Sequence, residues 1–524
     1  MGDEIGWPNR KRRNLEILGP HPPTDALNAR IVREEQIIAK TLSKFDSATA
    51  TFAWLDTIRA IEETVNLLTV EWEKEFAAAL FGLPVLQLTL STSHFQRVRL
   101  GLAKRFDDKY VARFTSLMMQ FNALGTSLRQ HGQPLLASSF TTLGTLIGYL
   151  QSRRRACVSL LHRLPNACTG AVLVRPVDPV VVFFPIIEFH AIPLTSARNA
   201  LLIRASTDRL DIGDGSAVEF ASLDGLFLEP ERSRITEMEL DEKGRSMLAG
   251  AERLRPNRLF SAAELRNDLL LLEAAYSEFD LSETKFGRAA ALIRNISRNF
   301  VDRDFWVKIP ERDMIKLLKR MEISPDLQDA LVFRGTSYSE STDTYAPLVR
   351  VNDVYYSTVT LLSRFAYYWR ARTLDKIKRF QIRSGFIFEK AVANELREQG
   401  FEIKEIKRIG RHEFDVIALG DGVIWNIQCK NNFLDLGYLE ASPERFARYN
   451  LRLVRSYERA LDKDRRREHV LAGHTLSGDI EHVVVSRFPV ICSNPRILPF
   501  SLIREFRQRM SLLGKSADDI RARS

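Results

Sequence analysis

The sequence contains little cysteine. Only four of its 524 residues are cysteines, and none of them has the CxxC spacing of a metal ribbon: Cys157, Cys168, Cys429 and Cys492. This scatter argues against a disulfide scaffold and against a zinc ribbon, and it is typical of a reducing compartment. We therefore expect a cytoplasmic protein.

Long apolar runs are also missing. The most apolar stretch, PVVVFFPII at 179–187, is nine residues long, whereas a membrane-spanning helix needs about 20. Flanking charges and prolines predict a buried strand or loop here, and no membrane partner. The first residues, MGDEIGWPNRKRRN, lack the apolar segment of a secretory signal. Together these absences predict a soluble protein.

Positive charge is present but unevenly distributed. The net charge is +10, and from Ala371 onward 29 Lys and Arg residues stand against 21 Asp and Glu residues. Most of the excess therefore lies in the last third. A basic region joined to a nearly neutral one indicates contact with a polyanion.

Apolar residues recur every three or four positions through much of 26–165, which predicts a helical region. Residues 171–230 contain short β-branched runs interrupted by prolines, and there we expect strands or irregular structure. Further helices are expected at 262–279, 286–300, 311–323 and 356–380.

At this length we expect more than one domain. We divide the chain into a helical N-terminal region (1–170), a mixed, mostly helical middle region (171–350) and an α/β C-terminal domain with its lead-in helix (351–524). Helical regions of this kind serve as scaffold, as dimerisation surface or in recognition of a partner protein, and no motif chooses between these roles.

The stretch EFDVIALGDGVIWNIQCKN, residues 413–431, has the pattern of a β-hairpin. Asp421 and Gly422 between two β-rich runs favour a two-residue type I′ turn. In that register Gly420 lies opposite Val423, and the pairs step outward from there.

The same register places Asp415 opposite Gln428 and Glu413 opposite Lys430. Because side chains alternate between faces, these four polar residues share one face of the hairpin. The other face is apolar and is formed by Val416, Ala418, Val423, Trp425 and Ile427.

Upstream, SGFIFEKAVANELREQGFEI at 384–403 predicts a helix that Ser384 caps and Gly400 ends. Glu389 lies in the middle of its apolar stripe, whose other members are Phe386, Val392, Ala393 and Leu396. A carboxylate there needs a cation, a metal ion or a hydrogen-bond donor. The polar face of the hairpin is the expected source, although a nearby arginine such as Arg383 would also satisfy it.

A buried glutamate with an aspartate beside a lysine suits metal-dependent hydrolysis of phosphodiesters. Mg²⁺ prefers oxygen ligands, keeps several waters and binds through one or two carboxylates. The metal lowers the pKa of a bound water and stabilises transition-state charge, while a lysine orients the water or offsets phosphate charge.

These elements, GxxFE on a helix, then EFDVIA, then QCK, resemble the PD-(D/E)XK or restriction-endonuclease-like nuclease superfamily. The nearest branch is the Mrr-like one, where Gln commonly replaces the acid of (D/E)XK. The resemblance covers 385–431 well and 375–500 loosely. It implies a mixed β-sheet flanked by helices, DNA as substrate, and Mg²⁺ as cofactor with Mn²⁺ as a substitute. It also implies a defence or restriction nuclease, targeted or regulated by its N-terminal region.

The resemblance implies catalytic roles for Glu389, Asp415, Gln428 and Lys430. It implies metal ligation by Asp415, by Glu389 and by the backbone carbonyl of Cys429. The Cys429 side chain is expected to face the apolar side and to serve packing.

Other features of the motif differ between branches of the superfamily. Glu413, two residues before Asp415, is an accessory candidate because some branches carry Glu-x-Asp there. Phe414 replaces the signature proline. Gln428 removes one negative charge, which keeps a second interpretation open: a catalytically silent nucleic-acid-binding or assembly protein with this fold. A third interpretation is an RNA-cleaving nuclease.

Residues 442–467 predict a helix with Ser442 as its cap and Pro443 in its first turn. Five arginines follow one face of this helix and could track a phosphate backbone: Arg445, Arg448, Arg452, Arg455 and Arg459. A solvated basic face is the alternative. Four histidines near the site lack HNH or HExxH spacing and are expected to be structural or exposed: His412, His469, His474 and His482.

Overall fold

The computed structural model describes residues 24–210, 242–253, 261–374, 376–432, 442–473, 478–487 and 490–511. The N-terminal half of the described chain is mostly helical, as expected for 26–165. Its helices are α1 (Thr24–Leu42), α2 (Ser47–Val65), η2 (Asn66–Thr69), α3 (Lys74–Phe81), α4 (Ser93–Ala103), α5 (Asp108–Gln130), α6 (Pro134–Ala137), η3 (Ser138–Phe140), α7 (Leu143–Ala167), α8 (Pro179–Ile186), the π turn η4 (Ile187–Ala191), α9 (Ile192–Leu210), α11 (Glu242–Leu248), α12 (Ala262–Ala274) and α13 (Lys285–Asn299).

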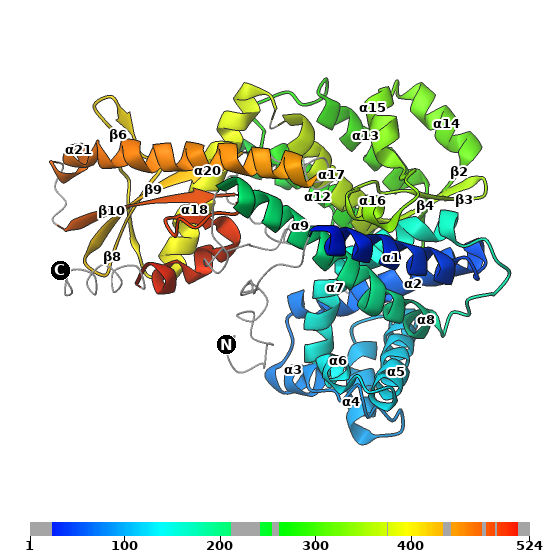
Figure 1. Cartoon of the computed structure of the whole chain (residues 1–524). Coiled ribbons are helices and arrows are strands. Elements are labelled where there is room, and N and C mark those ends of the chain that lie inside the picture. Colours follow the sequence, from blue (N-terminus) through cyan, green and yellow to red (C-terminus); the bar gives the residue numbers. More distant parts are fainter. Residues whose placement is uncertain are drawn as a thin grey trace.

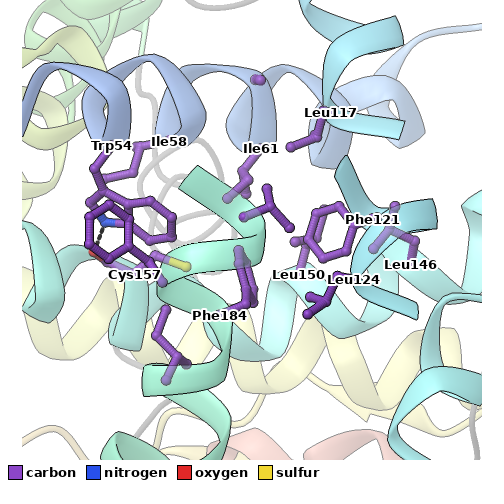
Figure 2. Packing of buried hydrophobic residues seen from close by; sticks show 14 of the residues in the cluster. Trp54, Ile58, Ile61, Leu117, Phe121, Leu124, Leu146, Leu150, Cys157 and Phe184 are labelled. Carbon is purple, nitrogen blue, oxygen red and sulfur yellow. Dashed lines mark hydrogen bonds between the residues drawn. The ribbon is translucent and has the colours of Figure 1, made fainter. Parts of the chain in front are cut away.

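The largest core lies between α2, α5, α7 and α8. Figure 2 shows side chains of these helices gathered around Phe121, Leu150 and Phe184. The indole of Trp54 is fully buried, and its Nε1 donates to the backbone oxygen of Cys157 at 2.9 Å. The polar atom of this large side chain is therefore satisfied inside the core.

The expectation of a strand or loop at 179–187 is wrong. These residues form α8, which continues through η4 into α9 even though Pro185 lies inside it. A short apolar run reads alike in a buried strand and in a buried helix, and Pro179 at the first helical turn favours the helix. Of the wider expectation of strands or irregular structure at 171–230, residues 171–178 form no regular element, and residues 179–210 are helical. Residues 211–230 lie outside the described part of the chain, as do residues 1–23.

One helix in the described ranges, Pro179–Leu210, is long and apolar enough to cross a membrane, and 44% of its apolar window is buried inside the protein. The core helix of a soluble protein passes the same test. Phe183 and Phe184 pack against Trp54 with ring centroids 5.2 and 5.8 Å apart. In this fold α8 therefore acts as a core helix.

The middle of the chain adds α14 (Glu311–Arg320), α15 (Pro325–Leu331) and α16 (Tyr338–Thr342), and the helices expected near 262–279, 286–300 and 311–323 are present. The sequence pattern did not predict a small antiparallel sheet, whose strand order is β1 (Val301–Asp302), β2 (Trp306–Pro310), β4 (Val354–Thr358), β3 (Val349–Val351). The aromatic helix expected at 356–380 is two helices, α17 (Val359–Leu374) and the start of α18 (Lys378–Glu398).

A buried ion triad joins α17 to the N-terminal helices. The Glu62 carboxylate of α2 accepts from Arg154 Nη2 of α7 at 2.6 Å and from Arg364 Nη2 of α17 at 3.2 Å. All three residues are buried. The two halves of the chain therefore share a charge network as well as apolar contacts.

The C-terminal region contains a mixed five-stranded sheet among helices (Figure 1). Its strand order is β11 (Ile497–Pro499), β10 (Asp479–Ser486), β9 (Val423–Lys430), β8 (Val416–Gly420), β5 (Glu402–Lys404). β5, β8 and β9 pair antiparallel, whereas β10 and β11 join in parallel. A separate two-strand ladder pairs β6 (Arg408–Ile409) with β7 (His412–Glu413).

Helices cover both faces of this sheet. α18 and η6 (Phe500–Glu505) pack on one face, in the apolar cluster that includes Val416, Trp425 and Ile427. α20 (Pro443–Arg465) connects β9 to β10 and packs on the opposite face with α21 (Glu468–Ala472). The connection between β9 and β10 thus places its crossover helix, α20, on one face of the sheet that contains β9, the strand that carries both Gln428 and Lys430.

The β8–β9 hairpin has the predicted register. Gly420 pairs with Val423 and Val416 pairs with Ile427. Asp421 and Gly422 have φ values of 57° and 78°, as a type I′ turn requires.

This turn gives a paired prediction of opposite signs. Gly422→Ala is expected to lower the free energy of unfolding by about 1 kcal/mol, because φ is positive there. Gly385→Ala is expected to raise it by up to about 1 kcal/mol, because this glycine is inside a helix and an added Cβ meets nothing within 4 Å. Urea unfolding monitored by circular dichroism measures both, and equal shifts in the same direction would contradict the expectation.

The helix α18 differs from its prediction at its start and along its apolar face. It begins at Lys378, so Ser384 is a buried residue inside the helix rather than its cap. Phe386 is 53% exposed, while Phe388 is fully buried. The reason is that α18 serves two cores: Ile387 packs with the middle region and Phe388 with the sheet. Gly400 follows the helix end with φ of 84°, as expected.

Candidate active site

Asp415 directly precedes β8, at the edge where β8 and β9 diverge. Its Oδ2 accepts from the backbone N–H of Cys429 at 2.7 Å. Burial raises the pKa of Asp415, and the hydrogen bond from Cys429 and the charges of Lys430 and Lys407 offset only part of that rise. A buried carboxylate whose charge is only partly compensated in this way favours the binding of a further cation.

Glu389 reaches the same place from α18. Its side chain is 17% exposed, and its Oε2 accepts from Lys407 Nζ at 2.8 Å. Lys407 Nζ also donates to the backbone oxygen of Asp415 at 2.7 Å. Lys407 therefore links the Glu389 carboxylate to the backbone of Asp415. The cation beside Glu389 was expected on the polar face of the hairpin or at Arg383, but Arg383 lies near Glu278, and the cation that the structure shows is Lys407.

Lys430 ends β9 and pairs with Ser486 of β10. Burial lowers the pKa of Lys430, while the charges of Asp415 and Asp464 raise it. A lysine with a lowered pKa carries a larger neutral fraction near neutral pH and can accept a proton. Lys430 thus has the environment of a general base or of a water-orienting group.

Gln428 lies two residues before Lys430 on the same face of β9, opposite Val484. Its Oε1 is buried and has no hydrogen-bond partner among the described residues. A buried carbonyl oxygen left unpaired costs about 1–3 kcal/mol. Such an oxygen is expected where a ligand completes its contacts.

These oxygens fit a hard cation with few protein ligands. Asp415 and Glu389 supply carboxylates and Gln428 supplies an unpartnered amide oxygen. Within the described ranges no group of three or more His, Cys, Asp and Glu residues is arranged to hold a metal ion. A cation here would keep several waters, as Mg²⁺ does, whereas Zn²⁺ sites need more protein donors.

The prediction for Glu413 is wrong. It does not face Lys430 but pairs with Arg408 in the β6–β7 ladder, and it is exposed. The β8–β9 ladder ends at the Val416–Ile427 pair, so it contains neither the predicted Asp415–Gln428 pair nor the predicted Glu413–Lys430 pair. Just before β8 the ring of Phe414 is buried, and the Phe414 N–H donates to Lys407 O at 3.1 Å. Glu413 instead affects Asp415 through its negative charge, which raises the pKa of the Asp415 carboxyl group.

The Cys429 side chain packs on the apolar face of the sheet, as expected. Burial raises the pKa of its thiol well above the ordinary value, and the charges of Asp415 and Glu389 add to this effect. The thiol is therefore not a nucleophile. The role of the Cys429 carbonyl as a metal ligand remains a prediction.

A polar network on the face covered by α20 was missed. His482 is buried, its Nδ1 lies 3.1 Å from Asn426 Nδ2, and its Nε2 lies 3.3 Å from Glu468 Oε2. Asp464, in the last turn of α20, is 7% exposed and interacts with the charges of His482 and Lys430. Of the other three histidines, His474 lies outside the described residues, His412 is half-buried and His469 is exposed.

Asp464 could have been found from the sequence. It lies seven residues after Tyr457 and three after Leu461, both buried, so it falls on the apolar stripe of its helix. This is the same anomaly that indicated Glu389.

The coupling between Asp464 and Lys430 gives a prediction. Because the Asp464 charge raises the pKa of Lys430, Asp464→Asn is expected to lower that pKa further. An NMR titration of ¹³C-labelled lysine, with the Lys430 signal assigned through Lys430→Arg, measures the shift. Asp462→Asn, exposed on the same helix turn and paired with Arg465, is the matched control and should leave the signal unchanged.

The arginine stripe lies along α20, and four of its five members are exposed: Arg448, Arg452, Arg455 and Arg459. The guanidinium of Arg452 lies over the ring of Tyr449, 4.7 Å from its centroid, and Arg445 is half-buried. Because the opposite face of the helix carries Asp464, the arginines point to solvent and do not converge on the site. Phosphate binding by this stripe remains a prediction.

The site thus combines groups from α18, β8, β9 and α20, with Lys407 at its edge. No protein-family model matches the chain, and no curated protein or solved structure matches it either.

Proposed function

We propose that the C-terminal region is a Mg²⁺-dependent endonuclease that hydrolyses DNA phosphodiester bonds and has the PD-(D/E)XK fold. The observation that carries the proposal is the electrostatic coupling of Asp415 and Lys430, with Gln428 and its unpartnered Oε1 two residues before Lys430 on the same face of β9. The helix, three antiparallel strands, crossover helix and parallel strand in chain order support the fold assignment.

The residues have distinct tasks in this proposal. Asp415, Glu389 and Gln428 hold the cation through oxygen atoms, and the Cys429 N–H fixes the orientation of Asp415. When bound, Mg²⁺ lowers the pKa of water and neutralises phosphate charge. Lys430 orients the attacking water or takes its proton. Asp464 holds Lys430 in its place from the α20 side.

The N-terminal region is proposed to target or restrain this activity in a cytoplasmic defence nuclease, through a partner protein or a second copy of the chain. The middle-region helix α9 packs on α20 through Leu202 and Ile203, and Asp464 lies in the last turn of α20. The packing of α9 on α20 therefore connects the helical half of the chain to the helix that carries Asp464.

Two other functions remain as alternatives. A silent nucleic-acid-binding or assembly protein is favoured by Gln428, which carries no charge. An RNA nuclease is compatible with the same groups, because they would act on the phosphodiester that DNA and RNA share.

The test is cleavage of supercoiled plasmid, single-stranded DNA and RNA by the full-length protein with Mg²⁺, Mn²⁺ or EDTA. Metal-dependent cutting of DNA that Asp415→Asn abolishes would support the proposal. Cutting of RNA alone would favour the RNA alternative. Binding without cutting by both proteins would favour the silent one.

A further inference from the structure

Lys407 closes the edge of the candidate site. Its Nζ donates to Glu389 Oε2 at 2.8 Å and to the backbone oxygen of Asp415 at 2.7 Å. Oxygen atoms of this kind are the ligands that Mg²⁺ and Mn²⁺ prefer. The ammonium group therefore lies between the two residues to which the proposed function assigns metal ligation.

The backbone of Lys407 is fixed, but its side chain is not buried. Ile409 and Phe414 anchor the β6–β7 ladder in a cluster with Ile417, Ile424 and Leu471. The Lys407 side chain is 64% exposed, and an exposed ion pair of this type is weak. The ammonium group can leave its carboxylate while its backbone stays in place.

An ammonium and a divalent cation repel each other strongly at contact distance. A metal ion that binds Glu389 Oε2 must therefore displace Lys407 from that atom. A phosphate group is the natural acceptor for the displaced lysine, since Arg408 of β6 and Arg411 in the turn between β6 and β7 are exposed and attract a polyanion.

We propose that Lys407 is an internal competitor of the metal ion and that a substrate phosphate draws it away, so that metal and nucleic acid bind cooperatively. This inference rests on the proposed function and adds a regulatory step to it. Without nucleic acid, Lys407 occupies Glu389 Oε2 and the backbone oxygen of Asp415. With nucleic acid bound, the same lysine contributes to substrate binding and the oxygens become available to the metal.

The experiment is calorimetric titration of Mn²⁺ into the full-length protein without nucleic acid. Lys407→Ala is expected to bind Mn²⁺ about fivefold more tightly than the wild type, the size of an exposed ion pair. Lys404→Ala is the matched control: this lysine is on the same segment, pairs with Glu402 at 2.5 Å, and should leave the affinity unchanged. A phosphorothioate oligonucleotide should then tighten Mn²⁺ binding to the wild type and have a smaller effect on Lys407→Ala.

The outcomes separate this inference from the proposed function. If Asp415-dependent Mn²⁺ binding is present and Lys407→Ala binds equally or more weakly, competition is overturned and the nuclease proposal stands. If the oligonucleotide tightens both proteins equally, the phosphate release is overturned. If neither protein binds Mn²⁺, both proposals fail.

Discussion

Asp415→Asn is expected to reduce the rate of metal-dependent DNA cleavage by about 10³-fold or more. In the proposed mechanism the charge of Asp415 is the main attraction for the cation. A catalytic metal supplies several kcal/mol of transition-state stabilisation, and each factor of ten in rate is worth about 1.4 kcal/mol. Plasmid nicking at fixed Mg²⁺ measures the loss.

The same substitution should not harm folding. An asparagine oxygen still accepts from the Cys429 N–H, and burial has already raised the pKa of Asp415. A raised carboxylate pKa means that the charged form is disfavoured in the folded state, so the protein gains stability relative to the unfolded chain as the pH falls through this range. We therefore expect an equal or higher melting temperature for Asp415→Asn.

A matched control comes from the hairpin turn. Asp421 is exposed, pairs with Arg507 at 3.0 Å and has a left-handed φ that asparagine tolerates. Asp421→Asn should cut at the wild-type rate. Wild-type cutting by Asp415→Asn, by contrast, would place the active site elsewhere.

Glu62→Ala is expected to lower the free energy of unfolding by about 3–5 kcal/mol, because it leaves two buried guanidinium groups without their shared carboxylate. Burial alone would raise the pKa of Glu62, but the charges of Arg154 and Arg364 outweigh it and lower the pKa. Urea unfolding at pH 7 measures the loss.

The pH dependence checks the cause. A lowered folded-state pKa gives stability that is complete above the ordinary value of 4.5 and declines as the pH falls from there through the folded value. The difference between Glu62→Ala and the wild type should therefore narrow in acid. Glu71→Ala, at an exposed position, should change the unfolding free energy by less than about 0.5 kcal/mol. A pH-independent difference would show that lost packing, not charge, causes the effect.

The hairpin could be predicted to the residue because two independent constraints agree. The Asp421–Gly422 turn sets the register, and a period of two then assigns each side chain to a face. The prediction failed at Glu413, because the β8–β9 ladder ends at Val416 and Glu413 pairs with Arg408 in the β6–β7 ladder instead. Local pattern cannot show where tertiary packing stops a strand.

The other errors have a similar origin. The strands from Val301 to Thr358 have two to five residues each. Such strands are too short for an apolar alternation of period two to be recognised in the sequence. Phe386 was assigned to a core because α18 was taken to pack on one partner, whereas it packs on two. Lys407 lies only eight residues before Asp415, but its contact with Glu389 depends on how the intervening chain folds. Asp464 stands out on its helix, but only the folded chain shows that it lies near Lys430 and Asp415.

The contact between α9 and α20 has a consequence for dissection of the protein. Leu202 and Ile203 cover part of the apolar side of α20, next to Phe446, Leu453 and Val454. A fragment that begins after α9 would carry this patch uncovered in water, and uncovered patches of this kind promote self-association. The C-terminal sheet and its catalytic candidates are therefore not expected to behave as an independent domain, because α9 from the helical half covers apolar residues of α20 that would otherwise be exposed to water.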